Sequence, residues 1–233
     1  MTLLHYPGKD LEAMSFAHNY HRWILDLIKP YLGSHVVEVG AGVGHFSQLL
    51  LETPIDTLYA FEPSANLHPL LSTTLQHFPR IRIHSEYFHS ELLDNPVDTI
   101  AYINVLEHIE NDAEELLTAY KALKPGGHLI VFVPALPWLF SLQDQSVGHF
   151  RRYTRKPLIR LSEAAGFHIV QARYFDIAGI LPWYIHCTLL KNTLQAGNVS
   201  LYDQAIVPLM RRIEALCPPP IGKNILLIAQ RRC

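Results

Sequence analysis

The stretch Val36-Val37-Glu38-Val39-Gly40-Ala41-Gly42-Val43-Gly44 decides the fold. A short run rich in valine predicts a buried strand, and residues 45–51 continue as a helix. Three glycines at alternate positions predict a tight turn between the two, because glycine lets the backbone bend sharply and lets a ligand approach the main chain. We therefore expect a strand–turn–helix unit that binds its ligand at the start of the helix.

The spacing of the glycines separates the ligand classes. A dinucleotide fingerprint, Gly-x-Gly-x-x-Gly, requires glycine where this chain has His45, and the Gly-Lys-Ser/Thr of a phosphate-binding P-loop is absent. The turn, preceded by Glu38, resembles the first motif of class I S-adenosylmethionine (SAM)-dependent methyltransferases. SAM has no phosphate, so close backbone approach and a carboxylate suit it. We expect Glu38, Gly40, Gly42 and Gly44 to bind SAM; a glycine-rich turn without a ligand is the alternative.

A second predicted strand, residues 57–61, ends in an acid. Glu62 follows the glycine turn at about the distance where nucleotide-binding α/β units place a carboxylate for the ribose hydroxyls. A carboxylate suits two vicinal hydroxyls because it accepts two hydrogen bonds. Glu62, with the adjoining Pro63, is therefore included in the predicted cofactor site. An acid that merely marks the surface end of a strand is the alternative.

The third predicted strand, residues 81–84, is followed by Glu86 and Tyr87. The resemblance implies that this position contacts the adenine, and we assign both residues to the cofactor site. Polar residues are common after strands, so this signal is the weaker one.

The fourth predicted strand ends in Asn104-Val105-Leu106-Glu107-His108, which resembles the fourth methyltransferase motif. Ligand chemistry in open α/β sheets takes place at the carboxyl ends of such strands. We assign Asn104 and Val105 to the cofactor site. His108 is a candidate substrate contact and a second candidate base, or else a turn residue that supports the cofactor loop.

The alternation of strands and helices over residues 35–133 predicts a parallel sheet covered on both faces. The Leu-Lys-Pro-Gly-Gly series at 123–127 leads into a fifth strand, and residues 167–174 and 224–230 predict the sixth and seventh. With the family resemblance, the expected fold class is α/β: a Rossmann-like seven-stranded mixed sheet with strand seven antiparallel, helices on both faces and a helical insertion, residues 176–222, between strands six and seven. We expect a single domain over residues 1–233.

Residues 10–32 predict an N-terminal helical cap, with apolar residues at helical spacing and a stop at Pro30 and Gly33. In related methyltransferases this helix closes over the cofactor. The resemblance implies that Tyr20 hydrogen-bonds the methionine carboxylate of SAM. A simple core aromatic is the alternative for Tyr20.

The segment 134–156 leaves the fifth strand at its carboxyl end and should lie over the methyl donor. Its Asp-x-x-x-Gly-His-x-Arg-Arg-Tyr series resembles a subgroup of bacterial methyltransferases, some of them found beside sugar-transfer enzymes. His149 is the candidate general base, because histidine titrates near neutral pH. The candidate substrate contacts are Trp138, Arg151, Arg152 and Tyr153, with the arginines suited to an anionic group. A structural salt-bridge network with Asp144 is the alternative.

Composition limits the partners. The chain has 233 residues, 49% hydrophobic and 17% charged, with a net charge of −2, which argues against nucleic acid as a partner. Three cysteines are too few for a disulfide framework, and no signal peptide or membrane-spanning run is recognised, so we expect a cytoplasmic location. His18 and His21 have no further ligand at metal-binding spacing, and no metal site is expected.

The predicted function is methyl transfer from SAM to an O, N or C nucleophile of an anionic or hydrophobic small molecule, with S-adenosylhomocysteine as the product. One alternative is a non-catalytic SAM-binding scaffold or sensor that acts through residues 176–222. A nucleotide-dependent oxidoreductase is disfavoured by His45. The insertion itself reads as a lid, a homodimer face, a seat for a lipid-like substrate, or packing on the sheet edge.

Overall fold

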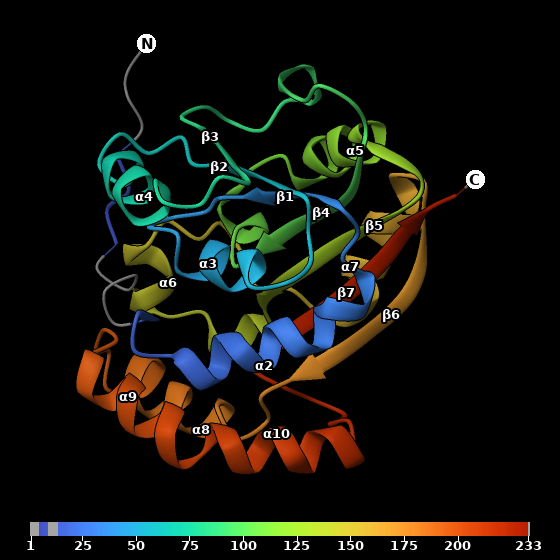
Figure 1. Ribbon diagram of the computed structural model, residues 1–233. Helices are drawn as coiled ribbons and strands as arrows, with labels where there is room; N and C mark the ends of the chain where they lie inside the picture. The colour runs from blue at the N-terminus through green and yellow to red at the C-terminus, as the bar shows by residue number, and fades with distance from the viewer. Residues whose placement is uncertain (1–4, 9–13, 233) are drawn as a thin grey trace.

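The computed structural model describes residues 5–8 and 14–232, and its centre is one seven-stranded sheet (Figure 1). The strand order is β3-β2-β1-β4-β5-β7-β6. The strands β1 to β5 run parallel to one another, whereas β7 is antiparallel to both β5 and β6. The predicted fold class is confirmed. The strands are β1 His35–Val39, β2 Thr57–Phe61, β3 Ile81–His84, β4 Val97–Ile103, β5 Leu123–Pro134, β6 Phe167–Phe175 and β7 Asn224–Arg231.

Helices cover both faces of the sheet because its central strands are apolar on both sides. In β1, Val37 belongs to one core cluster and Val36 to the other. The helices α5 (Asp112–Ala122) and α7 (Arg155–Ala164) contribute to the first cluster. The second cluster lies under α2 (His18–Ile28), α3 (His45–Leu51) and α4 (His68–Leu75).

The N-terminal cap helix is shorter than the sequence predicts. Of the predicted range 10–32, residues 10–13 lie outside the described part of the chain, and α2 begins at His18. It ends at Ile28 because Pro30 cannot continue the hydrogen-bond ladder, and Lys29–Tyr31 form a 3₁₀ turn instead. Residues 32–34 then lead into β1.

The insertion between β6 and β7 is helical, as predicted. The sequence predicts two helical stretches in it, residues 180–194 and 203–216, but the structure divides it differently. It contains α8 (Ile180–Trp183), a π-helix (Tyr184–Leu189), α9 (Ala196–Ala205) and α10 (Val207–Leu216). Pro208 stands in the first turn of α10, where a missing N–H costs nothing, so it starts a new helix. The helices α9 and α10 contact each other and both contact α2, below which they lie in Figure 1.

Candidate active site

A cavity of about 530 Å³ opens at the carboxyl ends of β1, β4 and β5. This is the edge of an open α/β sheet where ligands bind, and the volume is in the range of small-molecule sites. Its walls come mainly from five places: α2 with the residues before it, the glycine turn after β1, the segment after β4, the segment 134–156, and the insertion. The insertion, residues 176–222, therefore forms a wall, or lid, of the site.

The glycine turn needs glycine for two physical reasons. Gly40, Gly42 and Gly44 have φ values of +71°, +58° and +91°, in the left-handed region that disfavours side chains. A Cβ on Gly40 would also lie 2.6 Å from Cγ2 of Val105. Gly40 and Gly42 line the cavity, whereas Gly44 lies at the start of α3 and Val105 packs behind the turn.

Two buried carboxylates flank this turn. Glu62 accepts hydrogen bonds from the N–H of Gly42 at 2.8 Å and of Ser64 at 2.9 Å, which ties the end of β2 to the turn. Glu38 lines the cavity and accepts a hydrogen bond from the hydroxyl of Ser47. Burial raises the pKa of Glu38 to about 8, opposed by the Ser47 hydrogen bond and reinforced by the charge of Glu62. Glu62 itself is not a lining residue.

The other predicted adenosine contacts lie away from the cavity. Pro63 follows β2 directly, and Glu86 and Tyr87 follow β3 on the exposed surface, with Tyr87 60% accessible. None of the three lines the cavity. Asn104 does: it has a φ of +55°, and its N–H donates to the carbonyl of Phe132 at 2.8 Å.

Tyr20 is a buried core aromatic and also lines the cavity. Its ring is buried and makes edge contacts with Phe132 and Phe175, as a core aromatic does. It also lines the cavity, and its hydroxyl donates to Oδ1 of Asn224 at 2.9 Å. Burial, and then the charge of Asp176, raises the pKa of Tyr20 well above its usual value, so the hydroxyl stays a hydrogen-bond donor.

The predicted network around Asp144 is present. Nδ1 of His149 lies 2.9 Å from Oδ1 of Asp144, and Nε of Arg152 donates to the same oxygen at 2.8 Å. Burial alone would raise the pKa of Asp144, but the His149 hydrogen bond and the Arg152 charge outweigh it and the pKa is lowered. His149 and Arg152 both line the cavity. The network leaves Nε2 of His149 without a strong partner.

Three predicted substrate contacts do not reach the cavity. Nη1 of Arg151 pairs with Oδ2 of Asp112 at 2.7 Å, and the hydroxyl of Tyr153 donates to the same oxygen at 2.9 Å. Both side chains thereby fix the segment 134–156 to the start of α5. Trp138 is 54% exposed and faces the ring of Tyr184. Of the predicted substrate contacts, His108 and Arg152 line the cavity.

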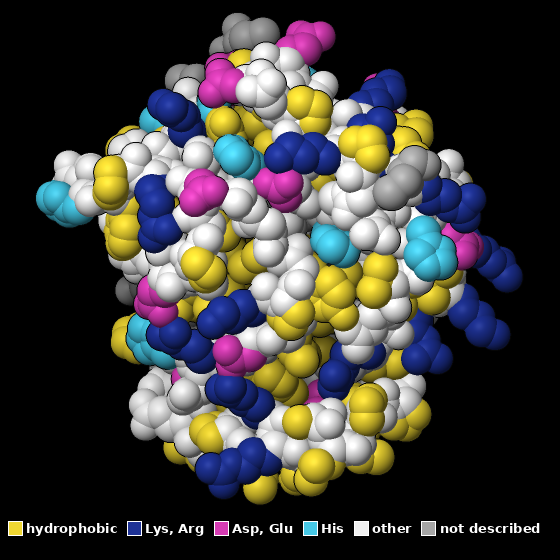
Figure 2. Space-filling view, turned by 45° about the vertical axis from the view of Figure 1, so that its right-hand side comes forward, with side chains coloured by type: hydrophobic (Ala, Val, Ile, Leu, Met, Phe, Trp, Pro, Cys, Tyr) yellow, Lys and Arg dark blue, Asp and Glu magenta, His cyan; other side chains and the backbone are white. Residues whose placement is uncertain are grey.

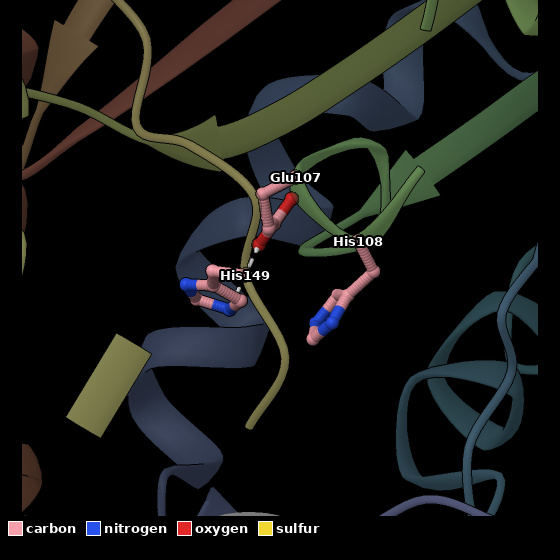
Figure 3. Close-up of side chains that lie close together, drawn as sticks. All are labelled: Glu107, His108 and His149. Atoms are coloured by element: carbon pink, nitrogen blue, oxygen red, sulfur yellow. Dashed lines mark ion pairs between the residues drawn. The ribbon is translucent and has the colours of Figure 1, made fainter. Parts of the chain in front are cut away.

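Glu107 is the main residue that the sequence analysis did not select. Its side chain is fully buried, its oxygens have no hydrogen-bond partner among the described residues, and Oε1 lies 3.8 Å from Nε2 of His149 (Figure 3). Burial raises the pKa of Glu107 to about 7. Burial, and then His149, lowers the pKa of His108 to about 4. The acid in Leu-Glu-His was the available sequence signal.

The lid contributes apolar wall residues that also were not singled out. Trp183 and Tyr202 line the cavity, and so does Lys223, just after the lid. Nζ of Lys223 lies 3.0 Å from Oδ2 of Asp176 and 5.0 Å from the ring centre of Tyr20. The remaining wall of the lid is largely apolar and includes Ile185, Cys187, Leu194, Val199 and Val207.

Known proteins resemble this chain in sequence and in fold. A family model described as "Methyltransferase domain" matches residues 16–172. A Mycolicibacterium smegmatis protein, named as an S-adenosylmethionine-dependent methyltransferase, is 25% identical over 140 residues, 59% of this chain and 53% of that protein. The chain thus spans about half the length of the curated relative it matches.

Two solved structures show the same fold. One is a methyltransferase in complex with the Haloferax volcanii Trm112 activator, with a TM-score of 0.63 and 12% identity over 96% of both chains. The other is Haemonchus contortus phosphoethanolamine N-methyltransferase 2 in complex with SAM, with a TM-score of 0.62 and 13% identity over 94% of this chain and 57% of that chain. No helix among the described residues is long and apolar enough to cross a membrane. Because the family model covers more than half of the chain, the protein belongs to the methyltransferase-domain family, within the class I SAM-dependent methyltransferase superfamily, and its cofactor is SAM.

Proposed function

We propose that this methyltransferase transfers the methyl group of SAM to an O, N or C nucleophile of an apolar small molecule. The observation that carries the proposal is one continuous cavity. Its lining includes the glycine turn, the apolar wall of the lid and His149. A methyl donor at the turn and an acceptor under the lid would then meet beside His149, shielded from water.

The cofactor fits the turn end of the cavity. Gly40 and Gly42 let the ligand approach the backbone, and Glu38 and Asn104 offer oxygen acceptors for the ammonium of the methionine part. Tyr20 offers a hydroxyl for its carboxylate. On the adenosine side, Glu62 still has lone pairs for the ribose beyond its two backbone bonds, with Pro63, Glu86 and Tyr87 next to it along the chain.

The chemistry needs mainly alignment, because the sulfonium is already reactive. A lone pair of the acceptor forms the new bond to the methyl carbon while the carbon–sulfur bond breaks. The electron pair of that bond stays on sulfur, which leaves neutral S-adenosylhomocysteine. A proton lost by an O–H or N–H acceptor passes to the cluster of Glu107 and His149, and His149 is the activating residue because its Nε2 is oriented by Asp144.

The charges in the cavity favour a hydrophobic acceptor over an anionic one. Arg152 and Lys223 are the basic side chains of Lys or Arg type that line it among the described residues. Each already contacts a buried carboxylate, Asp144 or Asp176. Neither cation is therefore free to pair with an anionic substrate, whereas the lid offers an apolar wall.

Two measurements test the proposal. Calorimetric titration with SAM and, separately, with NADH should show micromolar binding of SAM alone. Transfer of a tritiated methyl group from SAM into a bacterial lipid extract should then label material that partitions into organic solvent. SAM binding without label in lipids or in a water-soluble metabolite extract would support the non-catalytic scaffold instead. Label confined to the water-soluble extract would contradict the hydrophobic acceptor.

The cytoplasmic location remains part of the proposal, and a homodimer through residues 176–222 is one candidate use of the exposed lid face. A second copy of the chain is the partner that the sequence analysis names for the exposed lid face. Light scattering of the purified chain gives its mass in solution and tests the dimer directly.

A further inference from the structure

We infer that Glu107, His108 and His149 form a binding site for a divalent transition-metal ion. Each side chain offers one ligand atom, and these atoms all lie within 4.8 Å of one another (Figure 3). In tetrahedral coordination, two ligand atoms that are each about 2.1 Å from the ion lie about 3.4 Å from each other. Ligand atoms 4.8 Å apart would therefore have to approach by about 1.4 Å, so binding requires the side chains of His108 and His149 to turn toward the ion.

The carboxylate of Glu107 supplies an independent reason for a cation here. It is fully buried, and both of its oxygens are without a hydrogen-bond partner among the described residues. A buried carboxylate is costly unless it is paired or coordinates a metal. Arg152, the nearest permanent cation in the network, donates to Asp144 instead.

The orientation of His149 also matches metal ligation. Metal-binding histidines usually donate their second ring N–H to a carboxylate or a carbonyl, which fixes the ring. The carboxylate of Asp144 lies 2.9 Å from Nδ1 of His149 and is the acceptor for that N–H. This contact leaves Nε2 of His149 on the side of Glu107. The ring of His108 meets that of His149 edge-on, with the centres 4.6 Å apart.

The chemistry of the ligand set narrows the ion. Two imidazoles and one carboxylate suit Zn²⁺, Fe²⁺, Co²⁺ or Mn²⁺, and three protein ligands leave coordination positions open toward the cavity. This inference rests on the proposed function for its role. An ion here would bind the acceptor oxygen and lower the pKa of its hydroxyl. With the ion bound, Nε2 of His149 would serve as a metal ligand, and this role would replace its acceptance of the acceptor's proton.

Metal binding tests the inference without any assay of turnover. Untagged chain, first treated with chelator, is dialysed against Zn²⁺ or Co²⁺ and analysed by elemental mass spectrometry and visible absorption. We expect about one ion per chain and the absorption bands of Co²⁺ with nitrogen ligands. The variants His108→Ala and Glu107→Gln should lose the ion, and His45→Ala, a cavity histidine outside the group, should keep it.

Each result has one meaning. Absence of stoichiometric Zn²⁺ and Co²⁺ from the wild-type chain, or unchanged binding in both variants, would overturn the site. SAM titration of the same samples reports separately on the proposed function, because SAM binding at the glycine turn does not require the ion. SAM binding without metal would reject the ion alone.

A second inference comes from the outer face of the lid and is independent of the cavity. We propose that this face docks on an anionic lipid surface. On α10 and the residue before it, Ile206, Leu209, Ile213 and Leu216 recur at helical spacing, and Leu209 and Leu216 are 56% and 90% exposed. The opposite side of α10 faces the protein through Val207 and Glu214. The exposed stripe is thus additional to the packed one.

Other parts of the lid also expose large apolar side chains. Leu181, Leu189, Leu190 and Leu201 are all between 59% and 71% exposed. Figure 2 shows hydrophobic side chains with Lys and Arg among them on the lower surface of the molecule.

The exposed charged residues of the lid are basic, and its buried charged residues are acidic. All of its basic residues of Lys or Arg type are exposed, whereas all of its acids are buried. An apolar face with cations at its edge is the signature of a segment that lies in an anionic lipid interface. The exposed bases are Lys191, Arg212 and Arg211, of which Arg211 pairs with Asp26 of α2. The buried acids are Asp176, Asp203 and Glu214.

The same charges disfavour the homodimer. A two-fold interface places the same patch against itself, so Arg212 and Lys191 of one copy would face the cations of the other. An anionic membrane complements this face, and it would bring an apolar acceptor to the lid.

Sedimentation with vesicles tests the docking. We expect binding to phosphatidylcholine vesicles that contain phosphatidylglycerol, weakened by salt, and about tenfold less binding to phosphatidylcholine alone. Arg212→Glu and the triple change of Leu209, Ile213 and Leu216 to Ser should reduce it, and Leu117→Ser, an exposed leucine on α5, should not. Equal binding to both vesicles, no binding, or a dimer by light scattering that does not bind vesicles would overturn the proposal.

Discussion

The carboxylate of Asp203, on α9 of the lid, accepts a hydrogen bond from the backbone N–H of Tyr20 in the cap helix at 2.8 Å. Its other oxygen accepts from the N–H of Asn19 at 3.0 Å. The first N–H groups of a helix have no partner inside the helix, and a negative charge there is favourable. One side chain of the lid therefore caps the helix that carries Tyr20. This contact links the lid to the part of the cavity wall that Tyr20 forms.

Replacing Asp203 should loosen this connection. In Asp203→Ala two helix N–H groups lose their partner, which should lower the free energy of unfolding by about 1–3 kcal/mol. Thermal melting with and without SAM measures the effect, and we expect a lower melting temperature and weaker SAM binding. Gln204→Ala, on the exposed side of the same helix, is the control. A melting temperature equal to that of the control would show that the contact does not hold the lid.

Glu62 should be required for SAM binding. Glu62→Ala removes the carboxylate proposed for the ribose hydroxyls, and calorimetry should show SAM affinity reduced about tenfold or more. Because Glu62 also holds the N–H groups of Gly42 and Ser64, melting without SAM must be compared. Glu52→Ala, an exposed acid, is the control. Unchanged affinity in a stable variant would remove Glu62 from the cofactor site.

Local patterns predicted the fold, and long-range pairing limited the prediction of the site. The apolar strands and the glycine turn are short-range signals, so the seven strands and the antiparallel β7 followed once the family resemblance was added. The partner of Arg151 and Tyr153 is Asp112, on a different element. Nothing near those residues in the sequence indicates that their polar groups are already bound.

Long-range pairing also explains why the sequence analysis did not select Glu107. Leu-Glu-His reads as a motif ending, and only the folded chain brings its acid to His149. The division of the lid into helices was predicted wrongly for a local reason. The predicted helix 180–194 continues past Leu189, where the π-helix ends, because the mostly apolar sequence up to Leu190 shows no break there.

SAM binding should release a proton from Glu38. Its pKa of about 8, raised by burial, keeps the carboxyl largely protonated at pH 7 in the free protein. A cationic ammonium bound beside it favours the carboxylate, so the proton leaves. Calorimetry at pH 7 in buffers of different ionisation enthalpy should therefore report release of up to about one proton, and Glu38→Gln should abolish that release. A buffer-independent enthalpy for the wild-type chain would exclude an ammonium next to Glu38.

The folded-state pKa of Glu38 also sets a pH dependence of stability. Since it lies above the usual value of 4.5, the folded chain holds this proton more tightly than the unfolded chain. The contribution is complete below pH 4.5 and is lost as the pH rises toward 8. Glu38→Gln should therefore gain stability relative to the wild type between pH 5 and about 8 in denaturant titrations. Parallel pH profiles for the two chains would contradict the raised pKa.

His149 should govern turnover and leave cofactor affinity unchanged. It lines the cavity and lies beside Glu107, and it is not among the residues proposed to bind SAM. In His149→Ala the acceptor loses its activating contact, so transfer of labelled methyl groups from SAM should fall by about 10²–10⁴-fold, while calorimetry gives the affinity of the wild type. His77→Ala, an exposed histidine, should match the wild type in both measurements. Normal transfer in His149→Ala would remove the activating role, and catalysis would then rest on alignment of donor and acceptor alone.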